Sequence, residues 1–261
     1  MTSLASLLAI VAALATPPTN PVPPTTPPQR MEVPWRVGER AEYEVRFSSA
    51  RVGTGSMEVM GIVPIRGKDA WHTMFRLTGG TFFYKVNDVF ESWSDVTNYA
   101  SLRFHSDQDE GPNEREKCYE IFPDRGVYIE ETAKGDNATK EQPSVDQPLD
   151  DGSFLYFVRT VPLEVGQTYT FNRYFRPDRN PVTIKVLRKE RVKVPAGVFD
   201  AIVLQPIIKT KGIFSEEGEA QVWLMDDPSR IMLQMKSKLK IGSINLYLKS
   251  YRPGPAAPAT R

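Results

Sequence analysis

Two histidines and two pairs of aspartates are the side chains of this 261-residue chain best suited to acid–base or metal chemistry. His72 and His105 each lie in a segment that alternates like a β-strand. Zinc is held by histidine, cysteine and carboxylate ligands around one tetrahedral site, and neither histidine has a second ligand at metal-binding spacing. We therefore interpret both histidines as structural or surface residues, with catalysis and metal binding as the less favoured alternative.

The paired aspartates are Asp150-Asp151 and Asp226-Asp227. The second pair stands in a strand–turn–strand corner, where an aspartate accepts a hydrogen bond from the backbone two residues on. A hydrolase with two carboxylates would need both acids to meet at about 5–10 Å across the fold. The sequence favours the turn role and leaves open a hydrolase built on Asp226, Asp227 or His105.

Sequence motifs of known catalytic or cofactor sites are missing. The chain holds no G-x-S-x-G, H-E-x-x-H or P-loop pattern, and Gly53-Thr54-Gly55 falls short of a dinucleotide fingerprint. The single cysteine, Cys118, allows no intramolecular disulfide and no cysteine-based zinc site. It is typical of a small buried hydrophobe, and a reactive or intermolecular thiol is the alternative. We predict no catalytic residue, no metal and no cofactor, and a protein that is not an enzyme.

The charge of the chain argues against nucleic acid as a partner. Lys+Arg total 33 and Asp+Glu 32, which gives a net charge of +1. Phosphate binding needs a concentrated basic face, whereas here the basic residues alternate with acidic ones. This pattern indicates a solvated surface.

Aromatic residues are densest between Phe82 and Trp93. Such a concentration usually forms core, but apolar and aromatic side chains also line small-ligand cavities. If a cavity exists, we expect aromatic residues from this segment, from a short helical pattern and from a late strand to line it. The predicted ligand-binding residues are Phe82, Tyr84, Phe90, Trp93, Phe154, Phe157 and Trp223.

The N-terminal segment of the chain predicts export. Residues 1–15 are small and apolar and end in Ala13-Leu14-Ala15, which is typical of a signal-peptide cleavage site. The run is too short to span a membrane and lacks the usual basic start, which a misplaced start codon would explain. The alternative is an apolar tail of a cytoplasmic protein. We expect a signal peptide over 1–15, a proline-rich linker over 16–32 and a disordered tail over 253–261, with the mature protein in the periplasm or cell envelope and without a transmembrane segment.

Alternation with a period of two dominates between Trp35 and Tyr251 and predicts strands. Gly53 and Gly55 predict a turn or bulge, Gly79-Gly80 predicts a break between strands, and Gly242-Ser243 predicts a tight hairpin. One stretch, 152–159, has helical spacing and predicts a short helix capped by Asp150 or Asp151.

The predicted fold class is mainly β. Ten or more antiparallel strands must curl, split or close, so we expect one large curved sheet or a half-open β-barrel with one short helix. Residues 33–252 are predicted to form a single domain.

Several segments resemble a bacterial family known as domain of unknown function 3108, over essentially the whole predicted domain. The matching segments are Val37-Gly38-Glu39-Arg40, Arg51-Val52-Gly53-Thr54-Gly55, residues 162–169 (PLEVGQTY), 194–201 (VPAGVFDA), 222–230 (VWLMDDPSR) and Ile241-Gly242-Ser243. The resemblance implies an exported, mainly antiparallel β domain and supplies no catalytic residues. Its outline is similar to periplasmic lipoprotein carriers, in which a curved sheet holds acyl chains against a helix.

Three functions fit the sequence. The first, which we favour, is a non-enzymatic module of the cell envelope that binds a lipid-like or other apolar ligand inside the curved sheet. The second is a structural or interaction protein that binds an envelope protein through its sheet edge or an exposed patch. The third is the hydrolase described above.

Overall fold

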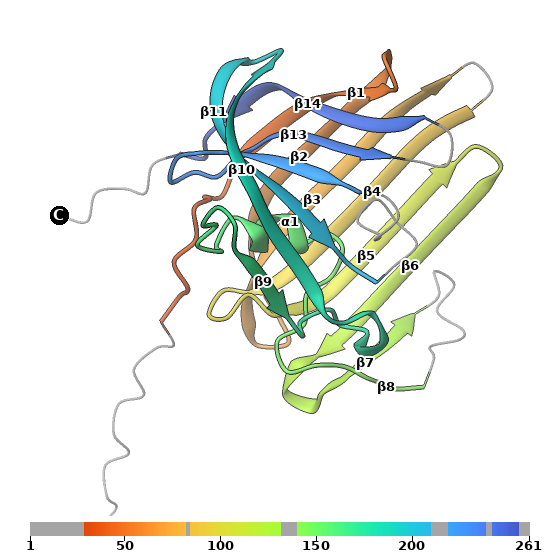
Figure 1. The fold of residues 1–261 in the computed structure, drawn as a ribbon. Coiled ribbons are helices and arrows are strands. Elements are labelled where there is room, and N and C mark those ends of the chain that lie inside the picture. The colour runs from red at the N-terminus through yellow and green to blue at the C-terminus, as the bar shows by residue number, and fades with distance from the viewer. Residues whose placement is uncertain (1–28, 82–83, 132–139, 210–218, 239–241, 256–261) are drawn as a thin grey trace, which may run out of the picture.

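Fourteen antiparallel strands form one curved sheet in the computed structural model, which describes residues 29–81, 84–131, 140–209, 219–238 and 242–255 (Figure 1). The strands are β1 (Arg40–Phe47), β2 (Ala50–Ile65), β3 (Lys68–Thr81), β4 (Tyr84–Asp95), β5 (Ser101–Glu110), β6 (Asn113–Phe122), β7 (Val127–Glu131), β8 (Gln142–Pro143), β9 (Thr168–Phe171), β10 (Val182–Val194), β11 (Gly197–Ile207), β12 (Gln221–Met225), β13 (Met232–Lys238) and β14 (Ser243–Arg252). The helical elements are α1 (Phe154–Val158) and the 3-10 turns η1 (Pro123–Arg125) and η2 (Pro177–Arg179).

The sheet is a meander whose first and last strands, β1 and β14, lie side by side in its middle. Its order is β8-β7-β6-β5-β4-β3-β2-β1-β14-β13-β12-β11-β10-β9, and β1 pairs with β14. The chain thus runs outward to β8, crosses to β9 and returns to the centre. Alternation produces one buried face, because residues two apart share a side of the pleat. Tyr43 and Val45 of β1 are buried in this way.

The helix α1 lies inside the curve of the sheet (Figure 1). All five of its residues are buried. A five-residue helix is too short to be stable in isolation, so its packing inside the sheet stabilises it. The segments that follow the two edge strands, β8 and β9, meet at a parallel bridge between Leu149 and Tyr174. The prediction of a curved, partly open antiparallel barrel with one short helix is therefore confirmed.

A buried aspartate forms hydrogen bonds within the turn that precedes the helix. Asp150 Oδ1 accepts the Ser153 backbone N–H at 2.7 Å, and Ser153 Oγ accepts the Asp150 N–H at 2.9 Å. Ser92 Oγ of β4 donates to Asp150 Oδ2 at 2.7 Å. Burial raises the pKa of Asp150 to about 6 despite these hydrogen bonds. Asp150 therefore holds the turn before α1, whereas the residue at the cap position is Ser153, which makes no side-chain capping hydrogen bond; the predicted cap by Asp150 or Asp151 is wrong.

The glycines of β2 and β3 do not break their strands, so the predicted break at Gly79-Gly80 is wrong. The turn or bulge predicted at Gly53 is present as a bulge, because the pairing with β1 shifts register between the pairs Val45–Gly53 and Arg46–Arg51. Both strands run through these glycines, and Gly53 lies opposite Gly79. A Cβ on Gly53 would overlap the Thr78 carbonyl oxygen, and one on Gly79 would overlap the Val52 carbonyl oxygen. The glycines allow two long strands to approach more closely than side chains would permit.

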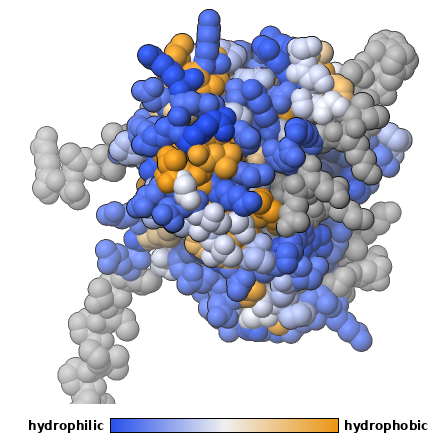
Figure 2. Space-filling model, in the orientation of Figure 1, coloured by the Kyte–Doolittle hydropathy of each residue, from blue (hydrophilic) through white to orange (hydrophobic). Residues whose placement is uncertain are grey.

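Ordered contacts begin within the segment predicted as a linker. The Met31 backbone N–H donates to the Val96 carbonyl at 2.8 Å, and Trp35 is buried in the main core. Across the described residues, no helix combines the length and the apolar character needed to cross a membrane. The face drawn in Figure 2 is mostly hydrophilic, with small apolar areas between polar side chains.

Candidate ligand-binding site

A cavity of about 820 Å³ opens on the concave side of the sheet. Small-ligand sites usually measure roughly 300–1,000 Å³. Strands from the first half of the sheet, the two strands β13 and β14, and the segment after β9 form its walls. The residue of α1 that contributes to it is Leu155.

Strand register creates two rows of side chains across one wall. The first row runs Phe75, Phe90, Ser106 and Lys117, from β3 to β6. The second row runs Leu77, Asp88, Gln108 and Arg115 over the same strands. Each row therefore changes from apolar on β3 to basic on β6.

Apolar side chains continue from β3 toward the middle of the sheet. Those that line this part of the cavity include Val45, Val52, Phe75, Leu77, Met235 and Ile244. The Phe75 and Phe90 rings stack with centroids 6.1 Å apart. This part of the site offers hydrocarbon contacts, which suit an apolar group.

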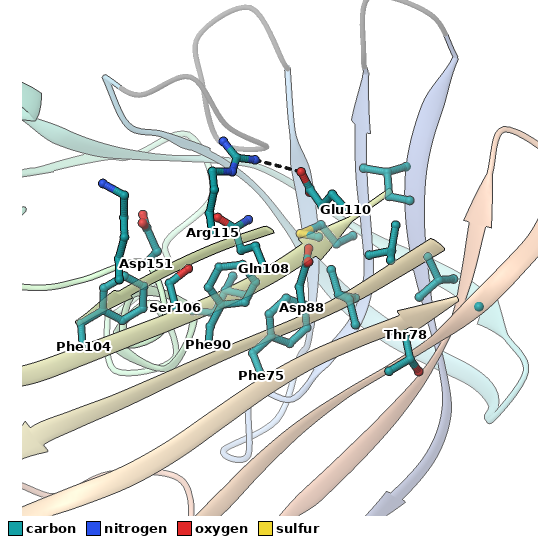
Figure 3. Close-up of a pocket in the computed structure, with 18 of the residues that line it drawn as sticks. Phe75, Thr78, Asp88, Phe90, Phe104, Ser106, Gln108, Glu110, Arg115 and Asp151 are labelled. Atoms are coloured by element: carbon teal, nitrogen blue, oxygen red, sulfur yellow. Dashed lines mark hydrogen bonds and ion pairs between the residues drawn. The ribbon is translucent and has the colours of Figure 1, made fainter. Parts of the chain in front are cut away.

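The opposite part of the cavity is charged. Arg115 donates to Glu110 at 3.0 Å, and Figure 3 shows this pair beside Asp88. Lys117 donates to Glu130 at 2.6 Å. Arg176 donates through Nη2 to the Tyr119 hydroxyl at 2.8 Å and to Glu130 at 3.3 Å.

Three further polar groups join the charged part from the segments that flank α1 and η2. The Tyr174 hydroxyl donates to Asp151 Oδ1 at 2.9 Å and accepts from Arg179 at 3.2 Å. Asp151 lines the cavity and is exposed to solvent there, and desolvation by the surrounding protein raises the pKa of its carboxyl.

Two polar atoms of the cavity residues have no hydrogen-bond partner among the described residues: Asp88 Oδ1 and Arg176 Nε. Both atoms are fully buried. Burial, together with the neighbouring charge of Glu110, raises the pKa of Asp88 to about 6. A buried acceptor or donor without a partner costs about 1–3 kcal/mol, so both atoms are candidates for ligand or solvent contacts.

The ligand-binding residues predicted from the sequence lie in different parts of the structure. Phe90 lines the cavity. Trp93 lies on the opposite face of β4, where it stacks on His72 with centroids 4.6 Å apart. Phe154 and Phe157 are buried within α1, and the Trp223 indole donates to Glu190 at 2.5 Å. These three are not among the residues that line the cavity.

The remaining two predicted ligand residues fall outside what the structure describes. Phe82 lies outside the described residues, and for Tyr84 the backbone position at the start of β4 is described. Sequence reasoning missed apolar cavity residues such as Phe75, Leu77 and Met235. It also missed the polar ones: Asp88, Arg115, Lys117 and Arg176. The missed strand residues face the same side of the sheet as Phe90, and this becomes visible once the strand pairing is known.

The groups of the alternative hydrolase do not meet. Asp227 Oδ1 accepts the Ser229 backbone N–H at 2.9 Å, as expected for a turn, and Asp226 pairs with Lys189 at 2.7 Å. His105 lies on the outer face between Glu91 and Glu116, at 3.5 and 3.1 Å. No contact among the described residues joins His105 to either aspartate.

A cysteine and two glutamates have ligand atoms within 4.8 Å of one another: Cys118, Glu120 and Glu131. Glu120 is already bonded to the guanidinium groups of Arg66 and Arg103. Burial and the two neighbouring glutamates raise the pKa of the Cys118 thiol, which disfavours the thiolate that metal binding needs. These groups therefore give no support to a metal site.

Comparison with solved structures supports the fold. A β-barrel-like protein of domain of unknown function DUF1849 from Brucella abortus has a TM-score of 0.51 at 12% identity, covering 86% of this chain and all (100%) of that one. A candidate lipoprotein from Parabacteroides distasonis scores 0.39 at 11% identity, and a candidate exported protein with a YmcC-like fold from Bacteroides fragilis scores 0.30 at 10%, each with the same coverage. These two scores are too low to support an argument about this chain.

Family membership follows from the sequence profile rather than from these structures. No curated protein matches the chain. The profile of the family described as "Protein of unknown function (DUF3108)" matches residues 42–249, which is most of the chain. The chain therefore belongs to the DUF3108 family.

Proposed function

We propose that this protein is an exported, non-enzymatic binding domain that holds a lipid-like or other apolar ligand in its concave cavity. One observation carries the proposal: a cavity of about 820 Å³ with an apolar part lies inside the curved sheet. The signal-peptide pattern of residues 1–15 supports export.

The size of the cavity is the physical reason to expect a ligand. Protein interiors are packed as closely as organic crystals, and voids larger than a water molecule are few. Apolar side chains that face an open cavity are in contact with solvent, and covering them with an apolar group is favourable. A hydrocarbon group would cover the rings of Phe75 and Phe90 and the chains of Leu77 and Met235.

The interaction-protein alternative has less support. The exposed large apolar residues of the described chain are scattered over several elements: Val37, Phe47, Met60, Val165 and Val198. The two edge strands, β8 and β9, are 2 and 4 residues long. Short edges offer little backbone to a pairing partner.

Fluorescence titration with the uncharged apolar dye N-phenyl-1-naphthylamine tests the proposal. Ser106 is buried and faces the cavity, so Ser106→Trp should fill the space and weaken dye binding by about tenfold or more, the equivalent of about 1.4 kcal/mol. Asp107→Trp is the matched control, because Asp107 is exposed on the outer face of the same strand. No dye binding to the wild type, or equal binding to all three proteins, would contradict the proposal.

A further inference from the structure

One side of the cavity is apolar and the other side is charged. Phe75 and Leu77 stand at the apolar side of the two cross-strand rows, and Lys117 and Arg115 stand at the other side. A purely apolar ligand would leave the charged part unused. A ligand with one polar end matches both parts.

Basic side chains outnumber acidic ones in the polar part, whose lining holds Arg115, Lys117, Arg176 and Arg179 against Asp88, Glu110 and Asp151. Glu110 is paired with Arg115, and Asp151 accepts a hydrogen bond from Tyr174. Arg176 donates through Nη2 to Tyr119 and Glu130, and its buried Nε has no acceptor among the described residues. A guanidinium group can donate two parallel hydrogen bonds to a carboxylate or phosphate.

The surroundings of Arg176 strengthen its interaction with an anion. Its guanidinium carbon lies 5.2 Å from the Tyr119 ring centroid, 5.4 Å from that of Phe175 and 5.9 Å from that of Tyr128. Lys117 also lies over the Tyr119 ring, at 5.9 Å. Aromatic rings exclude water and lower the local dielectric constant, so a charge–charge contact is worth more here than at the surface.

From this geometry we infer that the ligand is an amphiphile with one acidic head group, a carboxylate or a phosphate ester. The head lies against Arg176 and Lys117, and the hydrocarbon chain lies along Phe90, Phe75 and Met235. The inference rests on the proposed function, since it names the chemical class of ligand for the same cavity.

A cationic head is the opposite possibility and has weaker support. Its natural partner would be Asp88, whose Oδ1 lacks a donor among the described residues. Asp88, however, stands next to Leu77 in its row, and burial favours its uncharged form by raising its pKa to about 6. The arrangement favours an anion at Arg176 over a cation at Asp88.

Calorimetric titration with four probes of equal chain length tests the inference: hexadecanoate, hexadecyl phosphate, hexadecanol and hexadecyltrimethylammonium. Because hydrogen bonds between charged groups are stronger than those to a neutral hydroxyl, hexadecanoate or hexadecyl phosphate should bind at least about tenfold more tightly than hexadecanol. The tighter of the two acids identifies the head group. Inorganic phosphate alone should bind far more weakly, and equal affinity for it would overturn the assignment of an amphiphile.

Substitutions locate the head group. Arg176→Gln should weaken the binding of the acidic probes much more than the binding of hexadecanol, and retained hexadecanol binding shows that the cavity has folded. Lys117→Gln provides a second variant whose side chain is nearly half exposed and therefore tolerant of change. Arg191→Gln, at an exposed position on β10, is the matched control and should behave as the wild type.

The outcomes separate this inference from the proposed function. If hexadecanol binds as tightly as the acids, or if the quaternary ammonium probe binds best, the acidic-head inference is wrong and the proposed function stands. If acidic probes keep their advantage in both cavity variants, the head does not lie at Arg176 and Lys117. If no probe binds, the proposed function itself is wrong.

Discussion

Arg159 donates two hydrogen bonds to Glu39, one from Nη1 at 2.6 Å and one from Nη2 at 3.1 Å, across 120 residues of chain. Arg159 directly follows α1, and Glu39 directly precedes β1. Their side chains are 4% and 7% exposed. The Ser229 carbonyl accepts two more hydrogen bonds from Arg159, and Tyr251 donates to Glu39 at 3.2 Å. This network fixes the short helix inside the sheet.

Glu39→Gln should lower the free energy of unfolding by about 3–5 kcal/mol, because it leaves the Arg159 charge buried without its counter-charge. Urea denaturation followed by tryptophan fluorescence measures the change. The matched control is Glu219→Gln, which removes the acid of an exposed pair with Lys238 and should change stability by at most about 1 kcal/mol. A loss of similar size in both variants would show that the buried pair does not hold the helix.

Asp88→Asn should remove a pH-dependent loss of stability. The folded protein holds the Asp88 proton up to about pH 6, whereas an unfolded chain releases it near pH 4. A raised pKa in the folded state means that stability falls as pH rises from about 4 to 6 and stays lower above that. Relative to the wild type, the variant should therefore gain roughly 1–3 kcal/mol between pH 4 and pH 8.

Chemical denaturation at pH 4, 6 and 8 checks this prediction. Asp150 also has a raised pKa of about 6, but it is present in both proteins and cancels in the comparison. Asp107→Asn changes an exposed aspartate of the outer face and serves as the control. A stability difference between Asp88→Asn and the wild type that does not change with pH would contradict the assignment.

Gly79→Ala should destabilise the protein by roughly 1–3 kcal/mol, as overpacking of a core does. The added Cβ would overlap the backbone of Val52 and Gly53 on the neighbouring strand. Gly61→Ala, on the same strand pair, meets no atom within 4 Å and should change stability by at most about 0.5 kcal/mol. Thermal unfolding of the two variants gives the comparison, and equal melting temperatures would argue against a close approach at Gly79.

The sequence predicted the fold well because its information is local. Alternation in segments such as 42–47 places side chains on one face without knowledge of the partner strand. The helical spacing of Phe154, Phe157 and Val158 likewise predicted the short helix. Glycines were harder, since a glycine in a strand and a glycine in a turn look alike until the facing strand is known, as Gly79 shows.

The cavity could be predicted only in part. Aromatic content pointed to Phe90 and Trp93 together, yet residues an odd number apart in a strand face opposite sides of the sheet. The odd spacing between Phe90 and Trp93 alone could have shown that only one of them faces the cavity. The charged side was missed because Arg115 and Lys117 reach the cavity through the pairing of β5 with β6, and Arg176 reaches it through the segment after β9. Such contacts depend on tertiary structure.

The most direct test of the central claim is native mass spectrometry of the full chain, expressed in a host that exports it and purified without detergent, followed by organic extraction. The account predicts a reproducible mass excess that extracts as an amphiphile and that Ser106→Trp reduces. A bare monomer mass that stays unchanged after incubation with the extracted envelope lipids of the host would contradict it.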